Sequence, residues 1–122
     1  MNCPFCQSDR NSIFHEDELT MGLWDAFPVT KGHALIVTKR HVSSWFDTTD
    51  EEKLALIKST EQAKLIIERQ YTPDGFNIGI NINEQAGQTI FHCHIHLIPR
   101  RHGDVGNPRG GVRGVIPSKQ QY

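Results

Sequence analysis

The chain lacks the long apolar runs and the excess of positive charge that mark several common classes of protein. No stretch approaches the ~20 apolar residues that a helix needs to cross a bilayer, and the first residues lack the basic-then-apolar order of a secretory signal. Lys and Arg number 13 against 14 Asp and Glu, so the net charge is -1, which argues against binding to long nucleic acids. We therefore expect a cytoplasmic protein without membrane segments, whose nucleotide-like ligands are small.

Cysteine is also scarce, with three residues in the whole chain. A secreted disulfide framework normally uses an even number. The 122 residues contain no internal repeat and no low-complexity linker, and this length suits one domain. We expect a single domain over residues 1–122, with an irregular tail rich in Gly, Pro and Arg from about residue 102.

The clearest predicted element is a helix over residues 49–72. Thr49 and Glu52 fit a capping box at its start. Leu54 and Leu65 lie roughly opposite the main apolar face, where another subunit could cover them. That main face has five members at helical spacing: Leu56, Ile57, Thr60, Ala63 and Ile67.

Strands are predicted on both sides of this helix. The β-branched, apolar composition favours a strand over residues 35–38 and, more weakly, over residues 19–27. After the helix, apolar and polar residues alternate over residues 76–82 and again over residues 91–97, which is typical of an antiparallel pair with one face on the core. The expected fold is α+β, an antiparallel sheet of about five strands with one long helix packed on it.

Three histidines, His92, His94 and His96, alternate along the last of these strands. Side chains two residues apart on a strand point the same way, with α-carbons ~6.5–7 Å apart, so the three should form a row on one face. Cys93 points to the other, apolar side and is expected in the core. The row could be a solvated surface, a catalytic metal site or a nucleophilic site. We favour the nucleophile, because a neutral imidazole can attack phosphorus without losing a proton.

The residues around the histidines resemble the signature of the histidine-triad (HIT) family of nucleotide hydrolases and transferases, which is His-x-His-x-His followed by two apolar residues. The match continues through Ala86-Gly87-Gln88-Thr89 before the histidines and Pro99-Arg100 after them. Residues 28–37 look like the family's other conserved block. The resemblance covers roughly residues 3–104 and implies an enzyme acting on nucleoside phosphates.

The resemblance implies a role for each of several side chains. His94 would be the nucleophile that takes up a nucleoside monophosphate as a covalent phosphoramidate, and His96 would hydrogen-bond the phosphate. Gln88 would contact the phosphate bridge or the leaving group, and Thr89 the leaving group. Asp25 would accept both ribose hydroxyls, which suits a carboxylate.

Other polar residues would reach the phosphates, and the resemblance also indicates the substrate. Asn81 would lie beside a phosphate, with Asn83 as the alternative. The substrate branch favoured by Gln88 and Pro99-Arg100 is that of dinucleoside polyphosphates such as diadenosine compounds. A nucleoside phosphoramidase and a nucleotide-binding module with little turnover are the alternatives, and a homodimer is expected. Four arginines could meet distal phosphates: Arg100, Arg101, Arg109 and Arg113.

Cys3 and Cys6 have the spacing that chelates zinc, although a pair supplies only half of a tetrahedral site. Two reduced thiols are the alternative. Family members with an N-terminal Cys-x-x-Cys imply a structural zinc held by Cys3, Cys6, His41 and His92. In that case His92 orients the strand, and otherwise it is a third catalytic histidine. No organic cofactor is expected. By residue type alone, the candidate partners of the two cysteines are four histidines: His15, His33, His41 and His92.

Overall fold

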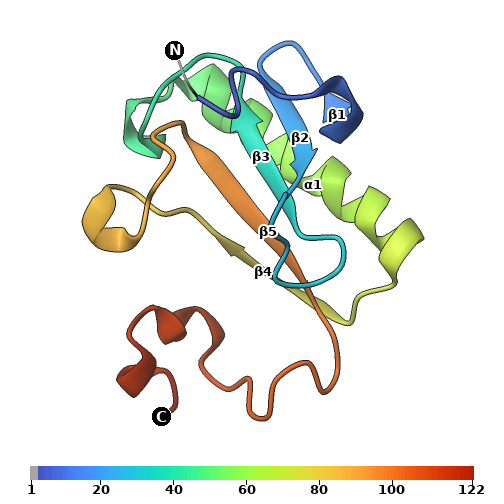
Figure 1. The fold of residues 1–122 in the computed structure, drawn as a ribbon, viewed down its shortest axis with the longest axis vertical. Helices are drawn as coiled ribbons and strands as arrows, with labels where there is room; N and C mark the ends of the chain where they lie inside the picture. Colours follow the sequence, from blue (N-terminus) through green and yellow to red (C-terminus); the bar gives the residue numbers. More distant parts are fainter. Residues whose placement is uncertain (1–2) are drawn as a thin grey trace.

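The computed structural model describes residues 3–122 and contains a five-stranded antiparallel sheet with one long helix, α1 (Asp50–Tyr71), packed on it (Figure 1). The strand order is β1-β2-β3-β5-β4. This arrangement confirms the α+β prediction and adds β1, a four-residue strand too short to give a clear alternation. The five strands are β1 (Ile13–Glu16), β2 (Thr20–Trp24), β3 (Ala34–Thr38), β4 (Gly75–Gly79) and β5 (His94–Arg100).

Strand β4 ends earlier than its alternating sequence predicts, and β5 begins and ends three residues later than predicted. The ladder ends where Gly79 pairs with His96, and β5 begins at His94. The backbone N–H of Cys93 donates to the carbonyl of Val42, at 2.6 Å, in the loop after β3. The chain therefore bends before β5, which leaves Phe91 half exposed. The prediction of three histidines in a row on one strand is wrong, because His92 precedes the strand.

Helix α1 begins at the predicted capping box. The Thr49 hydroxyl accepts from the N–H of Glu52 at 3.0 Å, and the Glu52 carboxylate accepts from the N–H of Thr49 at 2.9 Å. Arg40 donates to the same carboxylate at 3.0 and 2.7 Å, which lowers the pKa of Glu52 below its usual value although the side chain is buried. The start of α1 is thereby joined to the loop that follows β3.

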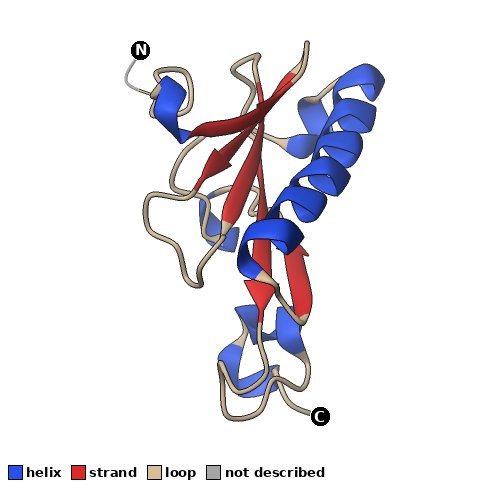
Figure 2. Ribbon diagram, turned by 90° about the vertical axis from the view of Figure 1, so that its right-hand side faces the viewer, coloured by secondary structure: helices blue, strands red, loops and turns tan. Residues whose placement is uncertain are grey.

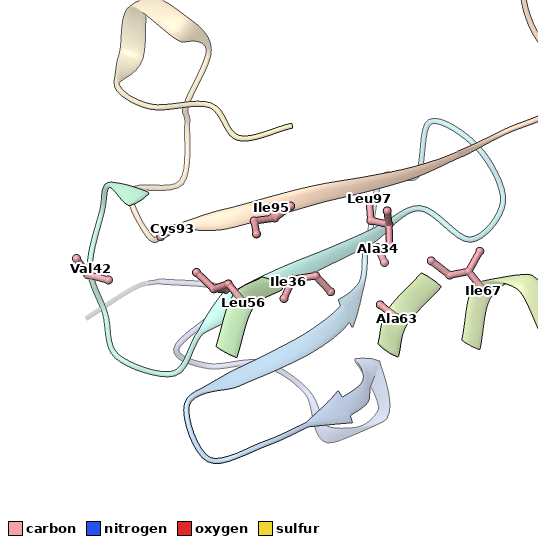
Figure 3. Packing of buried hydrophobic residues seen from close by; sticks show 9 residues of the cluster. All are labelled: Ala34, Ile36, Val42, Leu56, Ala63, Ile67, Cys93, Ile95 and Leu97. Atoms are coloured by element: carbon pink, nitrogen blue, oxygen red, sulfur yellow. The ribbon is translucent and has the colours of Figure 1, made fainter. Parts of the chain in front are cut away.

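The core lies between α1 and one face of the sheet (Figure 3). Leu56, Ala63 and Ile67 of α1 are buried as predicted, but Ile57 is 49% exposed. The helical period places Ile57 closer to Leu54 than to the buried face, so Ile57 joins Leu54 and Leu65 in a stripe of three exposed apolar residues. The sheet contributes four side chains to this core: Ala34, Ile36, Ile95 and Leu97.

The other face of the sheet carries the histidines of β5. His94 pairs with Val37 and His96 with Leu35, and paired residues share a face. The N-terminal turn, defined as residues 3–8, covers one end of this face. Figure 2 shows that turn and α1 on opposite sides of the sheet. The turn is anchored by Cys3 and Phe5, each 6% exposed.

The C-terminal tail, defined as residues 105–122, folds on itself. It contains the short 3-10 turns η4 (Gly111–Val115) and η5 (Pro117–Lys119). Arg113 donates to two carbonyls of the tail at 3.2 and 2.9 Å, and its guanidinium lies 4.8 Å from the Tyr122 ring. In the described part of the chain, no helix is both long and apolar enough to cross a membrane.

Candidate functional site

His94 is a buried imidazole with one nitrogen fixed by the backbone. It is 7% exposed, and its Nδ1 lies 2.7 Å from the carbonyl oxygen of His92. A carbonyl only accepts, so Nδ1 carries the proton and Nε2 keeps its lone pair. Burial lowers the pKa of His94 below the usual value of 6.5. The side chain is therefore a neutral imidazole with a free nitrogen, as a nucleophile requires.

His96 belongs to a hydrogen-bonded chain that includes His33. The N–H of Val29 donates to Nδ1 of His33 at 3.1 Å, so Nε2 of His33 carries its proton. That nitrogen lies 3.0 Å from Nδ1 of His96 and 3.3 Å from Asp25. When His33 donates to His96, Nε2 of His96 carries the proton and is a hydrogen-bond donor. Burial, and then the neighbouring histidines, lower the pKa of His96 to about 4.

His33 is a site residue that sequence reasoning considered only as a zinc candidate. It directly precedes β3, which pairs with β5. Its position beside a predicted strand was the one sequence feature that could have indicated a place in the site. Asp25, His33 and His96 also bring ligand atoms within 4.8 Å of one another, as a metal site would. However, the neutral His33 has no free lone pair, because Nδ1 already accepts a hydrogen bond and Nε2 is protonated. The geometry favours a hydrogen-bonded chain over a catalytic metal.

A cavity of about 510 Å³, called here the nucleotide cavity, opens beside these histidines. Asp25, Asn81 and Thr89 line it together with His94 and His96. One oxygen of Asp25 accepts from the N–H of a neighbouring residue at 2.8 Å, and its remaining lone pairs could accept hydroxyl groups. The volume suits a small organic ligand. The larger side chains of its apolar wall include Phe5, Leu23, Trp24, Phe27, Leu35 and Ile90.

Gln88 is turned away from this cavity. Its side chain is 2% exposed and its amide oxygen accepts from the N–H of Asn83 at 2.8 Å. Its amide nitrogen donates to the carbonyls of Ser43 and Ile90 at 3.0 and 3.1 Å. Gln88 thus holds the loop that carries Thr89, while Asn83 contributes its backbone to the same loop. Of the two asparagines considered, Asn81 is the one that lines the cavity.

The four arginines lie outside the nucleotide cavity. Arg100 donates to Asp104 at 2.8 Å and to Asn77 at 2.6 Å, and Arg101 donates to a backbone carbonyl at 2.9 Å. Arg109 and Arg113 lie against the ring of Tyr122, at 4.6 and 4.8 Å. Their cationic groups are therefore engaged within the protein and are not brought to the histidines.

A second cluster has the geometry of a metal site. Ligand atoms of Cys3, Cys6, His41 and His92 lie within 4.8 Å of one another. Nδ1 of His92 is 3.4 Å from the sulfur of Cys3, 3.5 Å from that of Cys6 and 3.1 Å from Nδ1 of His41. The His41 nitrogen is 3.2 Å from Cys6. Tetrahedral zinc would separate sulfur from nitrogen by about 3.5 Å and the nitrogens by about 3.3 Å, so these four residues could hold such an ion.

The tautomer of His92 also suits a metal ligand. Its Nε2 lies 2.6 Å from the carbonyl oxygen of Thr38, so Nε2 carries the proton and the Nδ1 lone pair faces the cysteines. His92 does not line the nucleotide cavity. The other zinc candidates lie elsewhere, since His15 contacts Ser59 at 3.3 Å and His33 is in the chain with His96. Cys93 is in the core as predicted, where burial raises its pKa to about 11.

Phe5, between the two cysteines, is a second residue that sequence reasoning missed. Its ring centre lies 4.9 Å from that of His94 and 5.7 Å from that of His92, both in edge-to-face geometry. Because Phe5 also lines the nucleotide cavity, the N-terminal turn is a wall of the site. Its position between metal-ligand candidates was the only signal in the sequence.

Comparison with known proteins agrees with the fold and identifies a family. A family model described as the HIT domain matches residues 7–103. Protein hit of Bacillus subtilis is 35% identical over 103 residues, covering 81% of this chain and 71% of its own length. The bis(5'-adenosyl)-triphosphatase of Dictyostelium discoideum is 37% identical over 98 residues, covering 80% and 66%. A zinc-bound histidine triad family protein from Mycobacterium smegmatis superimposes with a TM-score of 0.77 at 34% identity, covering 85% and 78%. The chain therefore belongs to the HIT domain family, as its histidine motif predicted.

Proposed function

We propose that the protein is a nucleotidyl hydrolase that cleaves the α-phosphate linkage of dinucleoside polyphosphates through a nucleotide bound covalently to His94. The observation that carries the proposal is the neutral, buried imidazole of His94, whose Nδ1 is fixed by the His92 carbonyl. The cavity beside it has the size and the mixed lining expected for a nucleoside phosphate.

In this proposal the nucleotide cavity binds one nucleoside of the substrate. The apolar wall contacts the base, the Asp25 carboxylate accepts the ribose hydroxyls, and Asn81 and His96 donate to the phosphate. Thr89 lines the same cavity from the loop before β5. Gln88 supports that loop, since a direct contact with phosphate would require its amide to give up three hydrogen bonds.

The reaction then has two displacements at phosphorus. Nε2 of His94 attacks the α-phosphorus, a P–N bond forms, and the P–O bond to the leaving nucleotide breaks with its electron pair on oxygen. The imidazole becomes cationic, and the bond from its Nδ1–H to the His92 carbonyl stabilises that charge. Water next attacks phosphorus, the P–N bond breaks, and a nucleoside monophosphate leaves as one proton passes to solvent. His96 donates to a phosphate oxygen in both steps.

The same nucleophile could act on a nucleoside phosphoramidate, in which case a P–N bond of the substrate breaks instead. The Dictyostelium relative, named as a triphosphatase, supports the anhydride substrate. A nucleotide-binding module is the remaining alternative and would bind without turnover. Comparing product release from diadenosine triphosphate and from adenosine phosphoramidate separates these three functions.

We also propose that Cys3, Cys6, His41 and His92 hold one structural zinc ion. The separations within the cluster and the tautomer of His92 support it. When bound, the ion would join the N-terminal turn to the segment before β5 through four protein ligands. His92 would then orient the strand that carries the nucleophile rather than exchange protons.

A homodimer is proposed from two unpaired surfaces. The stripe of Leu54, Ile57 and Leu65 on α1 is exposed, and one edge of β4 has no neighbouring strand among the described residues. Both features are typical of an interface between subunits. The molar mass in solution would test this part of the proposal independently of catalysis.

Replacing His94 tests the proposed mechanism. The variant His94→Asn should lose at least roughly 10³-fold in kcat for diadenosine triphosphate while keeping its thermal stability, because Asn cannot form the phosphoramidate. The matched control His102→Asn changes an exposed histidine outside the site and should leave the rate unchanged. Hydrolysis by His94→Asn at a rate close to that of the unmodified protein would contradict the mechanism.

A further inference from the structure

Two cavities meet at His33, His96 and Asn81. One is the nucleotide cavity, and the other, called here the tail cavity, measures about 430 Å³ and lies between strands β4 and β5 and the C-terminal tail. With the α-phosphate at His94 and His96, a leaving group that runs past His96 and Asn81 enters the tail cavity, because both residues also line it. The tail cavity thus offers a space for the leaving group.

The C-terminal tail, which forms one side of this cavity, is held in place by contacts within the protein. Gly111 lies beside β4, since an added Cβ would be in van der Waals contact with the Asn77 amide nitrogen at 3.4 Å, and its φ is +44°. The tail is held by its own hydrogen bonds, including those from Arg113 to two carbonyls and one of 3.1 Å from Asn107 to Gln121. A ligand that binds against this surface has little chain to order, which favours affinity.

The chemistry of the tail cavity suits an uncharged ring rather than a polyphosphate. Val112 and Val115, 60% and 75% exposed, line it from the tail, and Ile98 lines it from the face of the sheet that carries His96. Within residues 3–122, neither lysine nor arginine lines this cavity, although phosphates normally attract such groups. The Asn77 side chain lies at its edge, and the Asn81 amide makes no hydrogen bond to another described residue. Apolar contacts together with amides are typical of sites for a purine or pyrimidine base.

We propose that the tail cavity binds the second nucleoside of a dinucleoside polyphosphate, with its base against Val112 and Val115. This inference rests on the proposed function and specifies which residues recognise the leaving nucleotide. The phosphates run past His96 and Asn81, where the two cavities join. When the P–O bond breaks, the second nucleotide departs through the tail cavity with the electron pair on its phosphate oxygen.

Binding to a protein that cannot turn over tests the inference. In a His94→Asn background, the double variant Val112→Ser/Val115→Ser should weaken diadenosine triphosphate roughly tenfold by removing apolar contacts. ATP has the same number of phosphates without the second nucleoside, so its Kd, and that of AMP, should change less than about twofold. The control Ile116→Ser alters a residue of the tail that is equally exposed and lies outside the cavity, and should change nothing.

The outcomes separate the two proposals. Unchanged binding of diadenosine triphosphate by the double variant would overturn the tail cavity as a nucleoside site, and so would an equal loss for ATP. Either result leaves the nucleophilic role of His94 standing. If the His94→Asn protein with its native tail binds none of the three nucleotides, the proposed function fails and this inference fails with it.

Discussion

The N-terminal turn and the C-terminal tail both border the histidines of the candidate site, but different interactions hold them in place. They lie toward opposite ends of the molecule (Figure 1). In the turn, Cys3 and Phe5 are buried and contact the histidines of the site. The tail is stabilised mainly by bonds within itself, and Val112 and Val115 remain exposed. Changes in the turn should therefore affect stability and every nucleotide, whereas changes in the tail should affect only substrates that reach it.

The largest effect is expected from removing a ligand in the turn. Cys6→Ser should eliminate the proposed zinc and lower Tm by on the order of 10 °C, because the metal joins the turn to the rest of the fold. Metal analysis and thermal denaturation measure both results. A chelator added to the unmodified protein should lower Tm by the same amount. Full zinc content and an unchanged Tm in Cys6→Ser would show that a metal does not hold the N-terminal turn, and would contradict the difference drawn between the turn and the tail.

A tenfold effect is expected from the wall that the turn provides. Phe5→Ala should keep the zinc but weaken AMP and diadenosine triphosphate by about the same factor, roughly tenfold, because both nucleotides use the cavity that Phe5 lines. Titration calorimetry with each nucleotide is the measurement. Phe46→Ala is the control, since Phe46 is a phenylalanine exposed elsewhere on the surface. Weaker binding of diadenosine triphosphate alone, with AMP binding unchanged, would contradict the assignment of Phe5 to the cavity that both nucleotides use.

The smallest effect is expected from loosening the tail. Tyr122→Ala removes the ring on which Arg109 and Arg113 lie, and each exposed cation–π contact contributes ~0.5–1 kcal/mol. Diadenosine triphosphate should bind roughly two- to fivefold more weakly, while AMP binding and Tm stay unchanged. Tyr122→Phe keeps the ring and should behave like the unmodified protein. Weaker AMP binding in Tyr122→Ala would show that the tail supports the whole site.

Local chemistry explains which parts of the fold were predictable. The capping box at Thr49 and Glu52 and the buried face of α1 depend on residues a few positions apart, so the sequence contains the necessary information. The late start of β5 depends instead on the hydrogen bond from Cys93 to Val42, which is remote in the chain. The alternation of apolar and polar residues along a strand contains no information about such a contact.

In the candidate site, too, residues indicated by local sequence were predictable, and roles that depend on remote contacts were not. The motif indicated His94 and His96, and the spacing of Cys3 and Cys6 indicated a pair of metal ligands. The orientation of Gln88 could not be predicted, because its partners are backbone groups brought close by the loop. His33 was also missed as a partner of His96, since the pairing of β3 with β5 brings the two together across 63 positions in the sequence.

The most direct test of the central claim is the covalent intermediate. The protein should be mixed with diadenosine triphosphate, quenched within the first turnover at a pH that preserves phosphoramidates, and analysed by mass spectrometry. We expect the mass to increase by one bound adenosine monophosphate on the peptide containing His94, and the adduct to be absent from His94→Asn. Rapid hydrolysis with no adduct on any histidine, or an adduct on His96, would contradict the assignment of His94 as the nucleophile.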